Sequence, residues 1–134
     1  MSDDLITPDN VSKELIKSCF DAAYIDAIID KDGDVQMKDD KVFLRLTEKK
    51  DRIHFMCFFK FKENSQPLAR LQCVNSINDE FIMVRASLKE TRLIFDYDLM
   101  LDGGVTKKMM VMTAKRFASI PDAAVREHGN GIVE

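Results

Sequence analysis

Two aspartates on one predicted strand are the residues whose type and spacing come closest to a chemical site. Asp96 and Asp98 lie two apart in the stretch Arg92–Thr106, and Asp102 continues the row. Residues two apart on a strand share a face. Paired carboxylates can bind a metal ion or divide the roles of acid and base. Both uses need convergent partners, and the sequence has neither a metal-binding histidine motif nor a histidine close to these acids.

Two arginines offer these acids a simpler role. Arg85 and Arg92 fall on the same predicted sheet face, where they could neutralise the row across a hairpin. We therefore expect Asp96 and Asp98 to have structural or solvent-facing roles. The alternative is a small-ligand sensor, or an enzyme, that uses the two aspartates and the two arginines in a pocket.

A second acidic run resembles a calcium loop only superficially. Residues 30–34 read DKDGD. An EF-hand loop has its glycine at the sixth position, and this places Ile28 at the first ligand position, where a carboxylate is needed. The dipeptide Asp32-Gly33 is instead typical of a hairpin turn, so we predict a solvated turn. We expect no metal and no cofactor for the chain.

The thiols and the central histidine give little support to catalysis. Cys19, Cys57 and Cys73 are odd in number and widely spaced, which is typical of reduced, mostly buried thiols. Cys19 has no histidine near it in sequence, so it is a poor candidate for a nucleophile. His54 has no acid or second histidine at the spacing of a triad or metal site, so we interpret it as a strand-surface residue. The sequence therefore predicts a protein that is not an enzyme.

The strand that carries Asp96 and Asp98 organises the rest of the predicted fold. It breaks at Gly103-Gly104, and Thr106 can cap the helix that follows. A loop of even length over Leu88–Thr91 pairs this strand with the one before it so that their apolar residues coincide. The predicted core face is Ile82, Val84, Ala86 and Leu88 with Leu93, Phe95, Tyr97, Leu99 and Leu101.

The remaining elements follow from capping residues and hydrophobic periodicity. Three helices are expected. The first spans about Pro8–Ala23, and its shared face consists of Val11, Leu15, Ser18, Cys19 and Ala22. The second begins at Ser65-Gln66-Pro67 and has a buried stripe of Leu68, Leu71, Val74 (or Asn75) and Ile77, and the third spans about Lys107–Ile120, where Pro121 kinks or ends the helix. Strands are expected within Ile25–Asp51, including Val42–Thr47, and at Ile53–Lys62 and Glu80–Leu88. The strand at Ile53–Lys62 is expected to be buried on both faces.

Composition limits the class of protein. The 134 residues suit a single domain, predicted over 1–125 with a loose tail over 126–134. The net charge of −3 argues against non-specific binding to nucleic acid or to an anionic membrane. No apolar run approaches the roughly 20 residues of a membrane span, and the acidic N-terminus is not typical of a signal peptide. We therefore expect a cytoplasmic protein.

The chain resembles the YbjN family of small bacterial proteins over about Ile6–Pro121. The resemblance rests on ITPDNV, DGDVQM, PLARLQCVNSIND and LIFDYDLMLDGGVT, the last followed by a long helix. It implies an α+β fold in the order α-β(3-4)-α-β(2)-α with an antiparallel sheet, similar to the type III secretion chaperones. The family is labelled as regulators of sensory transduction, so the resemblance implies a chaperone-like or regulatory role. No target motif of a secretion chaperone is present, so a role in secretion does not carry over.

One face of the predicted sheet is too apolar to be solvated. If the inferred registers hold, the second face carries Phe81 and a candidate partner interface of Phe43, Met56, Phe58, Met83, Ile94 and Met100. A helix of the same chain, a second subunit or a protein client must cover such a face. We therefore expect a non-enzymatic protein-binding module, acting as a homodimer with a possible protein client.

Overall fold

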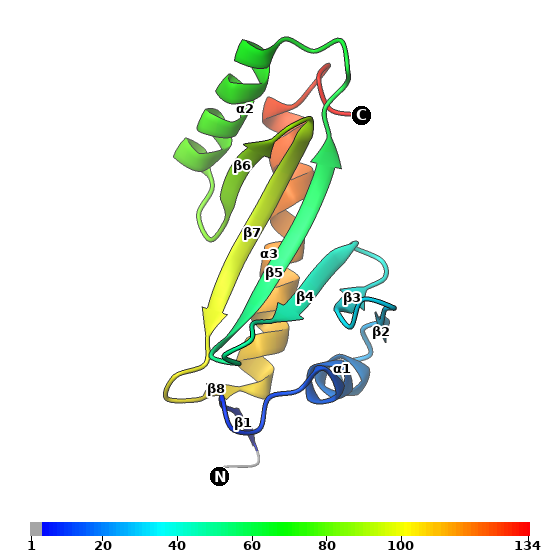
Figure 1. Cartoon of the computed structure of the whole chain (residues 1–134), viewed down its shortest axis with the longest axis vertical. Coiled ribbons are helices and arrows are strands. Elements are labelled where there is room, and N and C mark those ends of the chain that lie inside the picture. The colour runs from blue at the N-terminus through cyan, green and yellow to red at the C-terminus, as the bar shows by residue number, and fades with distance from the viewer. Residues whose placement is uncertain (1–3) are drawn as a thin grey trace. The chain divides into compact units, whose positions relative to one another are not determined.

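The computed structural model describes residues 4–134, and it has the predicted α+β class with an antiparallel sheet. Three helices and eight strands are formed by the described residues (Figure 1). Their order is β1 (Leu5–Ile6), α1 (Lys13–Ala22), β2 (Ala27–Ile29), β3 (Val35–Met37), β4 (Val42–Leu46), β5 (Arg52–Lys60), α2 (Pro67–Glu80), β6 (Arg85–Lys89), β7 (Arg92–Met100), β8 (Val105–Thr106) and α3 (Lys107–His128).

The strands form two sheets. Six strands make one sheet in the order β2-β3-β4-β5-β7-β6, and β1 pairs with β8 in a two-stranded sheet. The described chain divides into two compact units: the first contains the residues up to Phe55 with Asp98–Arg116, and the second contains Met56–Tyr97 with Phe117–Glu134. The predicted domain over 1–125 begins with three residues that lie outside the described part of the chain.

In the first unit, α1 begins five residues later than predicted. Ser12 is the N-cap, and its hydroxyl accepts a hydrogen bond of 3.0 Å from the backbone N–H of Leu15. The predicted start at Pro8 is wrong because the Asn10 side chain closes a separate turn, in which it accepts from the N–H of Thr7 at 2.8 Å. The buried face also differs from the predicted one: it consists of Ile16, Cys19 and Phe20.

A salt bridge supports the hairpins of the first unit. Strands β2 and β3 pair around the turn at Gly33, which has a φ of +84° that suits glycine. One carboxylate oxygen of Asp30 accepts the backbone N–H groups of Asp32 and Asp34. Asp34, only 6% exposed, accepts two hydrogen bonds of 2.9 Å from the guanidinium of Arg45. The acidic run is therefore bonded within the protein, and Asp34 is buried rather than solvated as predicted.

The turn before α3 has the predicted chemistry. Gly103 and Gly104 have φ values of +82° and +87°, which side chains rarely adopt. A Cβ atom on Gly104 would also lie 3.2 Å from Cδ1 of Leu5. Thr106 Oγ1 then accepts a hydrogen bond of 2.9 Å from the backbone N–H of Met109, so the predicted cap is confirmed.

In the second unit, α2 covers the edge of the sheet and buries only part of its predicted stripe, Ile77 with the neighbouring Cys73. Strand β6 is an edge strand, and the Asn78 side chain bonds both the N–H and the C=O of Ala86, at 2.8 and 2.9 Å. These bonds satisfy backbone groups that an edge would otherwise expose. The buried residues of α2 are Cys73 and Ile77, whereas Leu68 and Leu71 are 65% and 54% exposed.

The hairpin of β6 and β7 has the predicted register, although β6 is shorter than expected. Ala86 pairs with Phe95 and Leu88 pairs with Leu93, so the apolar residues coincide. The predicted strand over Glu80–Leu88 begins only at Arg85. Met83 has a φ of +64°, which is not extended backbone, and Ile82 of the predicted core is 78% exposed.

The end of the chain is more ordered than predicted. Helix α3 continues through Pro121 to His128 instead of ending near Ile120. The predicted loose tail then pairs with the end of β5: the N–H of Lys62 donates to the C=O of Ile132 at 2.7 Å, and the N–H of Glu134 donates to the C=O of Lys60 at 2.9 Å. Pro121 is buried, so packing offsets the hydrogen bond that a proline removes from a helix.

We predict that Arg45→Met destabilises the protein by about 1–2 kcal/mol, because the buried carboxylate of Asp34 loses its bidentate, charge-assisted hydrogen bonds. The measurement is urea unfolding followed by circular dichroism. Lys17→Gln is the matched control: it breaks the exposed pair with Asp21 and should cost at most about 0.5 kcal/mol. Equal losses in the two variants would contradict the structural role given to the Arg45–Asp34 bridge.

We predict that Thr106→Ala costs about 1 kcal/mol of unfolding free energy, because the N–H of Met109 loses its side-chain acceptor. Thr106→Ser keeps the hydroxyl and should retain most of the stability. The same urea measurement distinguishes them. If serine and alanine are equally destabilising, the hydroxyl does not cap α3.

Candidate functional site

The open face of the second unit carries most of the predicted interface. Along β5, Cys57 is buried whereas Phe58 is 46% exposed and Met56 is partly exposed. Along β7, Leu93 and Phe95 are buried and alternate with Ile94, which is partly exposed. The prediction that β5 is buried on both faces is therefore wrong. In this unit the buried residues of the strands form a core with Phe117 and Ala124 of α3, and the other face is left open.

Arginine side chains surround the apolar part of this face. The guanidinium carbon of Arg92 lies 5.7 Å from the ring centroid of Phe58, which is a cation–π contact. Arg85 donates two hydrogen bonds, of 2.9 and 2.7 Å, to the carboxylate of Asp96, which is only 8% exposed. The predicted neutralisation across the hairpin therefore occurs through Arg85, whereas Arg92 contacts an aromatic ring.

In the first unit, a histidine and an arginine approach the second aspartate. Nδ1 of His54 lies 2.8 Å from Oδ1 of Asp98, and Nε of Arg52 lies 3.6 Å from the same oxygen. Sequence reasoning missed this group because His54 precedes Asp98 by 44 residues. The signal that could have found it is the strand order: β5 lies beside β7, and alternation puts His54 on the face of its strand opposite to Ile53 and Phe55.

A histidine bonded to an aspartate is also the base and orienting group of a catalytic triad. Here both residues lie on strands, and the charged Arg52 shares the carboxylate, so we interpret the group as a cross-strand contact that stabilises Asp98. Two residues of the predicted partner interface also belong to the first unit. Phe43 is partly exposed on β4, and Met100 is 47% exposed at the end of β7.

The predicted interface residues thus belong to two units. Met56, Phe58, Met83 and Ile94 belong to the second unit, and Phe43 and Met100 belong to the first. None of the six is buried. Met83 lies in the loop that precedes β6 rather than on a strand.

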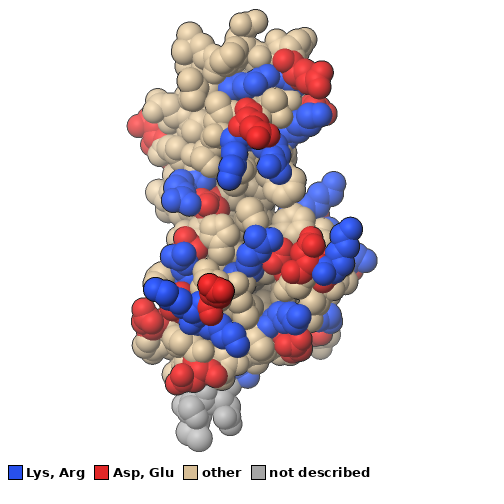
Figure 2. Space-filling view, in the orientation of Figure 1, with Lys and Arg blue, Asp and Glu red and all other residues tan. Residues whose placement is uncertain are grey.

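Helix α2 carries a second apolar surface, although the hydrophobic periodicity predicts these residues to be buried. Leu68 and Leu71 are three residues apart on α2 and point outward. Figure 2 shows the surface in the region of α2 as almost free of charged side chains, in contrast to the mixed charges over the strands. The second unit therefore offers two apolar surfaces, the open sheet face and the exposed side of α2.

Three potential metal ligands meet where α2 and α3 end. Glu80, Glu127 and His128 have ligand atoms within 4.8 Å of one another, and they form such a group among residues 4–134. Nε2 of His128 lies 2.7 Å from Oε1 of Glu80, and the His128 ring meets the edge of Phe81. The contact between His128 and Glu80 accounts for the closeness of these groups, so we interpret them as joining the two helix ends.

Two buried thiols have environments that oppose nucleophilic chemistry. Burial raises the pKa of Cys19 above the usual cysteine value, although Lys107 and Ser18 lower it by smaller amounts. Burial likewise raises the pKa of Cys73. Cys19, Cys57 and Cys73 are all buried and reduced, as the sequence predicted.

Comparison with known proteins decides the family. The model of the YbjN family, described as "Putative bacterial sensory transduction regulator", matches residues 12–127. The chain belongs to the YbjN family. Among solved structures, "Crystal structure of YbjN, a putative transcription regulator from E. coli" is similar, with a TM-score of 0.75 and 12% identity. The alignment covers 92% of this chain and 96% of that chain.

The structural likeness to YbjN from E. coli shows a shared fold, because 12% identity is too low to carry over a function. No curated protein matches the chain. The predicted YbjN family is thus confirmed over residues 12–127, which include DGDVQM and the two longer segments but not ITPDNV. The similarity of this fold to the type III secretion chaperones stays a prediction. Within residues 4–134, no helix has the length and apolar character that crossing a membrane requires.

We predict that Cys19 and Cys73 of this YbjN-family protein react slowly with Ellman's reagent at pH 8. Their raised pKa values reduce the thiolate fraction at any pH below them, and burial limits access. The rate should be at least about tenfold lower than in urea and should increase as the pH rises. Fast labelling of Cys19 in the native protein, read by peptide mass spectrometry, would contradict this view and reopen a nucleophilic role.

Proposed function

We propose that this YbjN-family protein is a non-enzymatic protein-binding module, a chaperone-like or regulatory adaptor that acts as a cytoplasmic homodimer. The observation that carries the proposal is the open sheet face of the second unit. There a half-exposed phenylalanine, Phe58, lies under the guanidinium of Arg92 and beside Met56 and Ile94. Aromatic residues with neighbouring arginines are enriched among the residues that dominate protein–protein affinity.

The charges on this face suit an interface. The Asp96 carboxylate is neutralised by two hydrogen bonds from Arg85, so a partner would not have to bury an isolated charge there. The exposed side of Arg85 and the Arg92 guanidinium can still bond a partner at the rim. A twofold dimer would place the same apolar patch against itself, as isologous interfaces do.

The alternative, a ligand sensor that uses Asp96, Asp98, Arg85 and Arg92, receives less support. Arg85 is engaged by Asp96, and Asp98 is engaged by His54 and Arg52. A ligand would have to replace these contacts rather than fill unsatisfied groups. The regulatory description of the family fits an adaptor as well as a sensor.

We predict a dimer that persists on dilution, with a mass near twice 15.4 kDa in size-exclusion chromatography with light scattering. Phe58→Asp and Ile94→Asp should each raise the dissociation constant about tenfold or more, because each places a charge in the centre of the apolar patch. Both positions are solvent-accessible, so the fold should survive, and circular dichroism checks this.

Leu68→Asp is the matched control, since it adds the same charge to the exposed surface of α2. Dissociation by Leu68→Asp, with no effect of Phe58→Asp, would place the interface on α2 and contradict the sheet face. A monomer at all concentrations would rule out the homodimer. An adaptor that binds a client as a monomer would then need its own test.

A further inference from the structure

The first unit contains a groove whose chemistry differs from that of the sheet face. It lies between the C-terminal half of α1 and the first turns of α3, and its volume is about 480 Å³. Pockets of about 300–1,000 Å³ hold small organic ligands. The groove is therefore large enough for a ligand, and the proposed protein-binding function does not use it.

The floor of the groove is apolar. Helix α1 ends in two small residues, Ala22 and Ala23, and the next turn brings Ile25 to the same side. These short side chains leave space opposite α3. The apolar lining consists of Cys19, Ala22, Ala23, Ile25, Val111 and Met112.

All charged residues that line the groove are lysines. Lys107, Lys108 and Lys115 come from α3, and no acidic residue lines the same space. Among the described residues, none of these three ammonium groups forms a salt bridge within 4.0 Å. The chain as a whole has a net charge of −3, so this concentration of positive charge runs against its overall balance.

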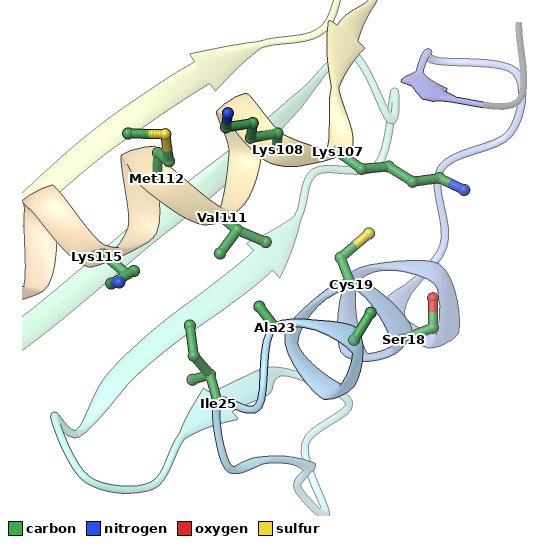
Figure 3. A pocket seen from close by; sticks show the side chains of 10 residues that line it. Ser18, Cys19, Ala23, Ile25, Lys107, Lys108, Val111, Met112 and Lys115 are labelled. Atoms are coloured by element: carbon green, nitrogen blue, oxygen red, sulfur yellow. The ribbon is translucent and has the colours of Figure 1, made fainter. Parts of the chain in front are cut away.

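Helical spacing explains how charge and apolar surface meet. Lys107, Val111 and Lys115 are four residues apart and share a face of α3. In Figure 3, Val111 points toward Cys19 and Ala23 of α1, while Lys107 extends along the upper side of α1. A ligand in the groove would thus contact an apolar wall along its length and an ammonium group at one end.

We propose that this groove binds an amphiphilic carboxylate, a molecule with a hydrocarbon chain and one anionic end, of the fatty-acid type. The hydrocarbon chain of the ligand lies between Ala23 and Val111, and its carboxylate meets Lys107. The site is separate from the proposed protein interface, and its test does not depend on association.

The charged neighbours decide which end of the groove holds the carboxylate. Lys115 also lines a smaller pocket of about 160 Å³, which contains Asp26, Asp39 and Asp40. Those acids offset the charge of Lys115 and disfavour an anion there. Lys107 is partly buried, and its ammonium group lowers the pKa of the Cys19 thiol, so its charge acts within the groove.

The test is isothermal titration of the full chain with sodium dodecanoate below its micellar concentration. Dodecyltrimethylammonium, with the same chain and the opposite charge, and inorganic phosphate, an anion without a chain, are the ligand controls. We expect dodecanoate to bind and both controls to bind at least about tenfold more weakly, because each lacks one of the two interactions. Methyl NMR signals of Val111 and Met112 should shift on addition of dodecanoate.

Two protein variants locate the site. Lys107→Gln should weaken dodecanoate binding about tenfold, because one charge-assisted contact is worth about that factor. Ala23→Trp should abolish binding by filling the groove. Lys49→Gln is the matched control, since it removes the same charge from an exposed position outside the groove.

Several outcomes would overturn the proposal. Equal affinity for dodecanoate and dodecyltrimethylammonium would show that the charge of the ligand plays no part in binding. Equal affinity for dodecanoate and phosphate would show that the hydrocarbon chain of the ligand plays no part. Unchanged binding in Ala23→Trp, with the fold retained by circular dichroism, would place the ligand elsewhere. Binding to phosphatidylglycerol vesicles without binding to free dodecanoate would mean a membrane contact instead of a ligand groove.

Discussion

Strand β7 imposes the constraint on which the rest of the fold depends. Its apolar residues Leu93 and Phe95 are buried, while the alternate positions carry Asp96 and Asp98. A carboxylate beside a core is costly unless a cation or donor accompanies it. Neighbouring strands supply these partners: Arg85 of β6 bonds Asp96, and His54 of β5 bonds Asp98. The sheet can therefore be built only in a register that meets both requirements.

The same constraint explains how much of the hairpin could be predicted. A slip of one residue between β6 and β7 would turn the apolar residues of a strand outward, and the short loop between the strands disfavours larger slips. The cap at Thr106 was predictable for a similar reason, since two glycines and a threonine at a strand–helix turn have few other uses. Both features depend on residues that are close together in the sequence, so they could be predicted from the sequence alone.

Other features depended on competition between segments, which local patterns do not show. Asn10 closes a turn that displaces the helix start from Pro8 to Lys13. Apolar residues lie all around α2, so spacing predicted the burial of Ile77 correctly but could not show that Leu68 and Leu71 would remain exposed. The contact of His54 with Asp98 needed the strand order, which places β5 beside β7. The groove was missed because it arises between α1 and α3, far apart in sequence.

The two proposed surfaces differ in whether their charged side chains have a partner of opposite charge. On the sheet face of the second unit, Asp96 is bonded by Arg85, so a protein can cover the face without leaving a carboxylate unpaired. In the groove, Lys107 and Lys108 have no carboxylate within salt-bridge distance among the described residues. Covering them with an apolar partner would cost their hydration, whereas an anionic ligand would replace it. Neutralised charge beside exposed aromatic surface fits protein association, and unneutralised charge above an apolar floor fits a small anion.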